Sequence, residues 1–200
     1  MDHPQADYME AVAYALDRLR RELPPQLCYH NLWHTQDDVL PAALQLARLS
    51  EVQQEEELHL LAVAAAYHDL GFVERTKDHE IVSSRIAAQT LPVFNFTSRQ
   101  IERVMGLILT TRLPQAPHDL LEQIMADADL DVLGREDFFP RSELLRQESA
   151  WLGQVYTPAE WNRIQFNFLQ RHAYFTAAAR TRREPAKQAF LHELAARLNH

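Results

Sequence analysis

Apolar residues recur every three or four positions along most of this chain, which is the spacing that one buried face of an α-helix produces. Alternation of apolar and polar residues, the signal of a half-buried strand, is not found. The pattern predicts helices over 7–22, from 31 past 47, over 55–69, 78–90 and 98–111, through 127–129 to 134, and over 136–153, 159–171 and 184–199.

Local signals place several helix ends. Asn31 is a good N-cap for the second helix, and Pro41 inside that helix predicts a kink. Gly71 follows the third helix, where glycine commonly ends a helix. The chain has only 4 glycines and is rich in good helix formers. Both the pattern and the composition therefore predict an all-α fold.

Length and charge restrict the class of protein. Two hundred residues with 46% hydrophobic content suffice for one core and hardly for two domains, so a single domain over residues 1–200 is expected. The net charge of -8 argues against a protein that wraps long nucleic acid. A small anionic substrate stays compatible with that charge, because a bound metal ion supplies positive charge locally.

The cellular setting follows from a few features. The single Cys28 excludes an intrachain disulfide framework and a cysteine-based zinc site, and it favours a cytoplasmic protein. Residues 1–4 open a polar stretch, so no signal peptide is expected. No run reaches the ~18 apolar residues of a membrane span. Apolar faces on the terminal helices would allow a homodimer.

Four short polar segments interrupt the apolar helices, and they carry the candidate chemistry. They are residues 29–34 (YHNLWH), His68-Asp69, His79-Glu80 and residues 127–129 (DAD). His68-Asp69 ends an apolar run that must be buried over most of its surface. An imidazole beside a carboxylate is costly in that setting unless a charged partner meets them. A divalent metal ion is the simplest such partner.

A metal site would need His34, His68-Asp69 and Asp129 to face inward from separate helices, as helix bundles arrange their metal ligands. Two imidazoles and two carboxylates suit Mn, Fe, Co, Ni or Zn, whereas Mg prefers oxygen ligands. The alternative is that the histidines are surface or hydrogen-bonded core residues and the acids are solvated. Ten histidines in 200 residues make chance pairs easy.

The ordered set His34, His68-Asp69 and Asp129 resembles the HD superfamily of metal-dependent phosphohydrolases, in particular its small single-domain bacterial members. The flanking residues are similar as well: YHNLWHT over 29–35, AAYHDLGF over 65–72, HEIVSS over 79–84 and DADLDVLG over 127–134. The similarity covers about residues 25–135. It implies an HD-type helical bundle on which helices of residues 136–200 pack.

The resemblance implies that His34, His68, Asp69 and Asp129 hold one divalent ion, which is Mn, Fe, Co, Ni, Zn or Mg. Asp127 competes with Asp129 for the fourth position, but two residues of helix turn them about 200° apart. Asp129 is preferred because superfamily ligands resemble an Asp followed a turn later by Leu-Gly, here at 133–134. Asp127 is interpreted as an N-cap or as a partner of a ligand.

His30 is the candidate general acid. Its Tyr-His-Asn-x-x-His setting is similar to the metal motif of cyclic-nucleotide phosphodiesterases, in which the first histidine resembles an acid that protonates the leaving oxygen. Asp69 would help to orient the attacking water. The alternative is that His30 only hydrogen-bonds in the turn before the helix. The chain is too short for that whole catalytic domain, so the substrate is not carried over.

Five residues are candidate substrate contacts: Arg75, Lys77, His79, Glu80 and Arg112. The arginines and the lysine are of the type that meets a phosphate, although an exposed loop charge is the simpler interpretation. His79 is also a candidate ligand for a second ion, as in binuclear HD proteins. A further histidine for that ion is not evident, since the Pro-rich loop offers only His118, so a mononuclear site is expected.

The resemblance therefore predicts hydrolysis of a phosphate ester in a small molecule, a nucleotide by preference, through metal-activated water. The alternatives are a non-catalytic metal- or nucleotide-binding regulator and a di-iron oxygenase on the same fold. Aromatic residues of the last third, Trp161 and Phe168 among them, are expected to pack the core rather than stack on a base. The basic residues of 180–187 are interpreted as solvated loop charges.

Overall fold

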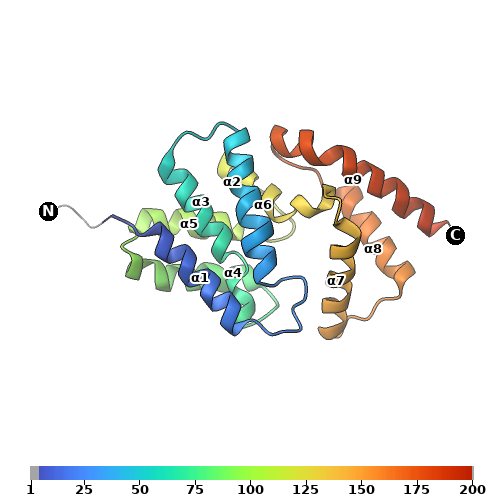
Figure 1. Ribbon diagram of the computed structural model, residues 1–200, viewed down its shortest axis with the longest axis horizontal. Helices are drawn as coiled ribbons and strands as arrows, with labels where there is room; N and C mark the ends of the chain where they lie inside the picture. The colour runs from blue at the N-terminus through green and yellow to red at the C-terminus, as the bar shows by residue number, and fades with distance from the viewer. Residues whose placement is uncertain (1–4, 200) are drawn as a thin grey trace.

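The computed structural model describes residues 5–199, which fold into helices joined by loops, with no strand in that range (Figure 1). The all-α prediction is confirmed. The helices are α1 (Tyr8–Glu22), a π-helical turn (His34–Val39) that leads into α2 (Leu40–Leu49), α3 (Glu55–Tyr67), α4 (His79–Thr90), α5 (Ser98–Leu109), α6 (Leu120–Asp129), α7 (Phe138–Trp151), α8 (Pro158–Arg171) and α9 (Ala177–Leu198). Short 3₁₀ turns cover Leu70–Val73, Leu91–Phe94 and Asp131–Gly134.

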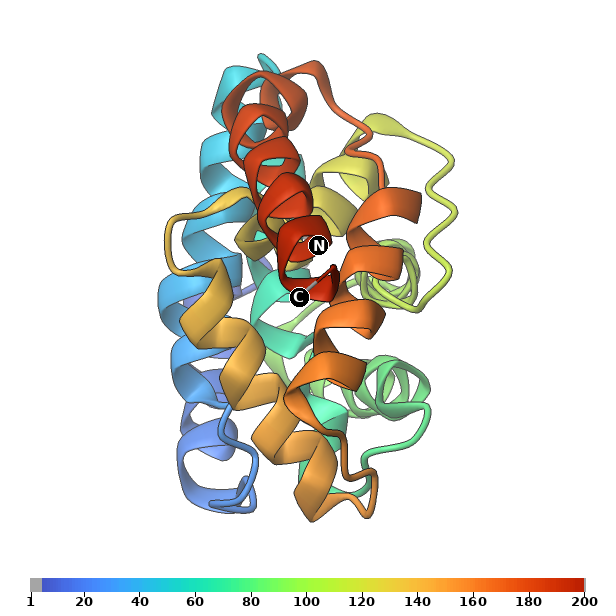
Figure 2. The same ribbon diagram turned by 90° about the vertical axis from the view of Figure 1, so that its right-hand side faces the viewer.

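Two groups of helices make up the molecule (Figure 1). In the first, α3 packs against α1, α2, α5 and α6. Its sequence explains this position, because nearly every residue from Leu60 to Tyr67 is buried and the helix has no polar face there. The second group is α7, α8 and α9, with α8 and α9 side by side (Figure 2). The described helices include none with the length and hydropathy that a bilayer span requires.

Residues 1–4, on which the expectation about a signal peptide rests, lie outside the described residues, as does the start of the predicted 1–200 domain. Helix ends elsewhere follow the sequence signals. The Asn31 side chain accepts a hydrogen bond from the backbone N–H of His34 at 3.1 Å, as an N-cap does. A π-helical turn, rather than a simple kink, comes directly before Pro41, with the N–H of Leu40 bonded to the carbonyl of Thr35.

The last helix is longer than predicted. It begins at Ala177 instead of residue 184, because Thr176 caps it by accepting from the N–H of Ala179 at 3.1 Å. Pro185 is tolerated inside α9 on the exposed face. The prediction of solvated loop charges is wrong for Lys187, which is helical, is 2% exposed and donates to the carbonyl of His172 at 2.7 Å.

Two glycines allow close backbone contacts that join these parts. A Cβ at Gly71 would lie 2.0 Å from the carbonyl oxygen of His79, so glycine lets the start of α4 reach the His68-Asp69 segment. A Cβ at Gly134 would lie 2.3 Å from the carbonyl oxygen of Arg183 in α9. The Arg183 guanidinium also donates to Asp131 at 2.6 Å, so α9 is held on the turn that follows α6.

Candidate metal centre

Four polar side chains meet between the first-group helices. His34 comes from the π-helical turn, His68 and Asp69 from the end of α3, and Asp129 from the last residue of α6. His34, His68 and Asp69 are almost fully buried, and the Asp129 side chain is 17% exposed. Segments that are 34 to 95 residues apart in the sequence thus supply one buried cluster, through the packing of α2, α3 and α6.

The distances within the cluster fit a shared ion. His34 Nε2 lies 3.5 Å from Asp129 Oδ1, and His68 Nε2 lies 3.4 Å from the same oxygen. These separations are too long for good hydrogen bonds. Ligand atoms arranged tetrahedrally at 2.0–2.2 Å from one ion are about 3.4 Å apart. The ligand atoms of His34, His68 and Asp129 all lie within 4.8 Å of one another.

Asp69 lies beside this group of three rather than within it. Its Oδ2 is 3.3 Å from His68 Nε2 and 3.6 Å from His34 Nε2, while its Oδ1 is 3.2 Å from His79 Nε2. The two carboxylates, Asp69 and Asp129, therefore approach the pair of imidazoles separately. A fourth ligand from Asp69 is compatible with this arrangement.

Two buried atoms of the cluster have no hydrogen-bond partner in the described chain: His68 Nε2 and Asp69 Oδ2. Buried polar atoms are nearly always paired, so these two indicate a group that binds there. The other nitrogen of His68, Nδ1, is 2.7 Å from the carbonyl oxygen of Ala65. That contact fixes the ring as a donor at Nδ1 and turns the Nε2 lone pair toward the cluster.

Electrostatics also favour bound cations at this position. Burial alone would raise the pKa of Asp69. The neighbouring His68 outweighs this effect and brings the pKa well below its usual range. Burial likewise opposes ionisation of Asp129, yet the adjacent imidazoles of His34 and His68 bring its pKa to about 2. Both carboxylates are thus ionised at neutral pH, which metal ligation requires.

Asp127 faces away from the cluster. Its carboxylate accepts hydrogen bonds from the backbone N–H groups of Phe175 and Thr176, each at 2.8 Å, and from the Thr176 hydroxyl at 2.7 Å. Asp127 therefore holds the residues that start α9. The two aspartates of the DAD segment have different partners, and Asp129 is the one beside the imidazoles.

His30 lies next to the cluster, and its partner was not visible in the sequence. Its Nδ1 hydrogen-bonds to the Glu148 carboxylate, which also accepts from the backbone N–H groups of Tyr29 at 2.9 Å and His30 at 3.0 Å. Glu148, in α7, is 1% exposed. Since Nδ1 is occupied, Nε2 is the nitrogen of His30 left for a ligand. No local motif marks Glu148, so only the folded chain identifies it.

His79 and Phe72 complete this side of the centre. The Phe72 ring stacks against two imidazoles, with centroid distances of 4.6 Å to His30 and 3.9 Å to His79. His79 comes from the first residue of α4, which Gly71 allows to approach. Glu80 follows it, with a carboxylate oxygen 3.7 Å from His79 Nδ1.

Comparison with known proteins identifies the fold around this cluster. The family model described as HD domain matches residues 35–131. The chain carries an HD domain. The matched segment includes His68, Asp69 and Asp129 and starts one residue after His34. Helices α7, α8 and α9, with Glu148, lie outside it.

A solved structure has the same fold as this HD protein. It is the crystal structure of a predicted HD superfamily hydrolase from an uncultured Thermotogales bacterium, with a TM-score of 0.60 and 21% sequence identity. The similarity covers 94% of this chain and 88% of that one, so it extends through the C-terminal helices. A search of curated proteins finds no match.

A cavity of about 400 Å³ opens beside the metal centre of the HD domain. Its polar side is formed by His34, Asp69 and Asp129 together with His30, His79 and Glu80. The opposite side is mostly apolar and includes residues from α7 and α8. The apolar lining residues are Leu113, Leu130, Val132, Leu133, Leu145, Trp161, Ile164 and Phe168. The cavity has the size and mixed lining of a small-molecule site.

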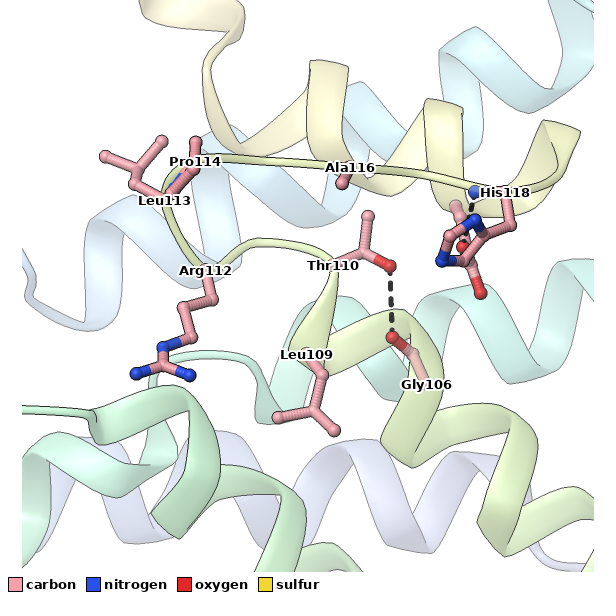
Figure 3. A pocket seen from close by; sticks show the side chains of 9 residues that line it. Gly106, Leu109, Thr110, Arg112, Leu113, Pro114, Ala116 and His118 are labelled. Carbon is pink, nitrogen blue, oxygen red and sulfur yellow. Dashed lines mark hydrogen bonds between the residues drawn. The ribbon is translucent and has the colours of Figure 1, made fainter.

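The three basic residues predicted to contact substrate do not line this cavity. Arg75 and Lys77 are exposed. Arg112 donates to Asp78 at 2.9 Å and lines a separate cavity of about 520 Å³ beside the loop that follows α5 (Figure 3). That second cavity contains none of the metal-ligand candidates. Contact of these three residues with a substrate phosphate stays a prediction.

Proposed function

We propose that this HD protein hydrolyses a phosphate ester of a small molecule, with a nucleotide as the expected substrate. The HD family, whose members are typically metal-dependent phosphohydrolases, supplies the reaction class. The proposal rests on one observation, which is that two groups of side chains lie at the same cavity. These are the His34, His68 and Asp129 cluster, with its unpartnered atoms, and the His30–Glu148 pair.

The proposed reaction gives the four metal ligands one role and Asp69 a second role. His34, His68, Asp69 and Asp129 would hold a divalent ion, which when bound supplies Lewis-acid polarisation of the phosphoryl group and a water of lowered pKa. Asp69, whose Oδ1 lies 3.2 Å from His79 Nε2, would help to orient the attacking water by accepting a hydrogen bond from it.

His30 provides the proton for the leaving group. Glu148 holds Nδ1, so the ring in its imidazolium form donates from Nε2 to the departing oxygen. Phe72 packs on one face of the ring and limits its rotation. The attacking and the protonating groups then lie on different elements around the same cavity.

The experiment is phosphate release from a panel of nucleotides and simple phosphate esters by chelator-treated protein supplied with Mn, Co, Ni, Mg or Zn. Asp69→Ala and a control variant on α1, Asp17→Ala, whose carboxylate is partly exposed, are measured in parallel. We expect metal-dependent release that Asp69→Ala abolishes together with metal binding. Full metal occupancy in Asp69→Ala contradicts the ligand assignment.

Metal content separates this proposal from the other functions on the same fold. One ion per chain with hydrolysis supports the phosphohydrolase. Two irons per chain, with Asp69 and His79 contributing to the second, would instead favour an oxygenase, since Asp69 Oδ1 lies 3.2 Å from His79 Nε2. Metal uptake with every ester left intact would favour a binding regulator.

A further inference from the structure

The C-terminal helices form much of the cavity wall that faces the metal centre. Leu145 comes from α7, and Trp161, Ile164, Gln165 and Phe168 come from α8. None of them belongs to the segment that matches the HD family. This wall of the cavity lies outside the segment matched by the HD family, and it is where the organic part of a substrate would lie.

Gln165 is the exception in this apolar wall. The residue is 7% exposed and lines the cavity, and its amide is not one of the fully buried unpartnered groups of residues 5–199. Trp161 and Phe168 lie four residues before it and three after it, so all three share one face of α8. The indole N–H of Trp161 already donates to the Ser142 hydroxyl at 2.9 Å, which leaves its ring as apolar surface.

The Gln165 amide borders the cavity and is not hydrogen-bonded within residues 5–199, so its polar atoms are available to a ligand there. Gln165 offers one acceptor oxygen and two donor hydrogens at a single position. A ligand group that presents a donor beside an acceptor on a planar edge would satisfy both. The ring surfaces of Trp161 and Phe168 suit the faces of such a planar group.

The charges of the cavity restrict the rest of the ligand. Its acidic and histidine lining residues are His30, His34, Asp69, His79, Glu80 and Asp129. The carboxylates of Asp69 and Asp129 already balance a divalent ion. Each phosphate beyond the first adds at least one negative charge, and the lining has no lysine or arginine to compensate it. The basic side chain Arg171 lines a neighbouring cavity instead.

Building on the proposed phosphohydrolase, we infer that Gln165 determines substrate specificity by pairing with the donor–acceptor edge of an uncharged planar ring. The ring lies against Trp161 and Phe168, and the substrate carries a single phosphate group at the metal centre. Nucleobases have such an edge, so the substrate class is a nucleoside monophosphate in preference to a di- or triphosphate.

The test compares phosphate esters that differ in their base, and nucleotides that have the same base and differ in the number of phosphates. The probes are the 5′-monophosphates of adenosine, guanosine, cytidine and uridine, their 5′-triphosphates, and p-nitrophenyl phosphate, which lacks the donor–acceptor edge. Affinity is measured by calorimetry on the metal-loaded protein, and kcat/KM by phosphate release. The variants are Gln165→Leu, which keeps the volume, and Gln170→Leu, a control on the exposed face of α8.

We expect at least one monophosphate to bind and react better than its triphosphate. Gln165→Leu should weaken binding and lower kcat/KM for that monophosphate about tenfold or more, and leave p-nitrophenyl phosphate within about twofold. Gln170→Leu should match the wild type for every probe. Equal effects of Gln165→Leu on both kinds of probe, or a preference for triphosphates, would overturn the inference.

The two readouts also separate this inference from the proposed function. Hydrolysis of p-nitrophenyl phosphate with nucleotide binding unaffected by Gln165→Leu would leave a phosphohydrolase and reject the role of Gln165. Base-dependent binding that Gln165→Leu removes, without hydrolysis of any probe, would support the role of Gln165 and reject the hydrolase.

Discussion

His30 and Glu148 are joined through their side chains although 118 residues separate them in the sequence. Glu148 also accepts from two backbone N–H groups of the turn that leads to His34. Helix α7 therefore fixes both the ring of His30 and the backbone before the first ligand candidate. The candidate acid depends on a helix that lies outside the segment matched by the HD family.

Replacement of Glu148 tests whether this pair acts as a unit. Glu148→Gln removes the carboxylate and keeps a carbonyl acceptor for the backbone N–H groups. We expect kcat to fall roughly 10- to 100-fold with metal content unchanged, and the pH dependence of kcat to change, because His30 is less firmly oriented for proton transfer. The measurements are kcat and KM over a pH series, with metal analysis.

Two controls make that result specific. Glu143→Gln on the same helix changes a partly exposed carboxylate that pairs with Arg146, and it should leave kcat unaltered. If His30 and Glu148 act together, the double variant with His30→Ala is no slower than His30→Ala alone. Additive losses would mean that Glu148 supports the fold and does not position His30.

The two aspartates of the DAD segment should give opposite phenotypes. Asp129→Ala removes an oxygen from the cluster and should abolish or strongly weaken metal binding with little loss of stability. Asp127→Ala leaves a buried and a partly buried N–H group just before α9 unpaired and should lower the free energy of unfolding by about 2–4 kcal/mol while metal binding persists. Calorimetric metal titration and chemical denaturation distinguish the two.

Asp127→Asn serves as the second variant if Asp127→Ala does not fold, because the asparagine oxygen still accepts from the backbone. Loss of metal binding in a folded Asp127→Asn protein, with normal binding in Asp129→Ala, would reverse the assignment of the ligand. The sequence favoured Asp129 through family resemblance, and the structure adds the separate partner of Asp127.

Gly71 should not accept a side chain. A Cβ there would lie 2.0 Å from the carbonyl oxygen of His79, so Gly71→Ala must push α4 away from the His68-Asp69 segment. We expect lower thermal stability and, in whatever protein folds, reduced activity because His79 is displaced. Gly106→Ala is the matched control, since its Cβ would meet its nearest neighbour at 3.8 Å and alanine favours a helix. Equal melting temperatures for both variants would argue against the close contact.

The sequence predicts those features of the fold that depend on residues close together in the chain, and it misses those that depend on contacts between distant segments. The apolar spacing of 7–22, 78–90 and 98–111 placed α1, α4 and α5 within a few residues, because a helix with one buried face repeats its pattern locally. The start of α9 was missed by seven residues. Its cap, Thr176, is held by Asp127 from another helix, and that contact is not visible in the local sequence.

The same distinction holds at the candidate site. His34, His68 and Asp129 were expected together from motifs in a known order, and the structure brings them together. Glu148 and Gln165 were not singled out, since a glutamate and a glutamine on amphipathic helices resemble ordinary surface residues. Their significance comes from burial and partners, which depend on how α7 and α8 pack on the HD domain.

Acid stability should depend on His172. Burial, with the nearby Lys187 ammonium, lowers the pKa of this ring to about 4, and neither ring nitrogen has a partner in the described chain. Between pH 6.5 and about 4 the unfolded chain binds a proton that the folded chain does not, so stability falls as pH is lowered through that window. The loss in the free energy of unfolding reaches roughly 3 kcal/mol.

His172→Phe should remove this part of the pH dependence, whereas His118→Phe, at an exposed position, should retain it. Denaturation midpoints between pH 4 and 7 measure the difference, and parallel curves for wild type and His172→Phe would contradict a buried neutral His172.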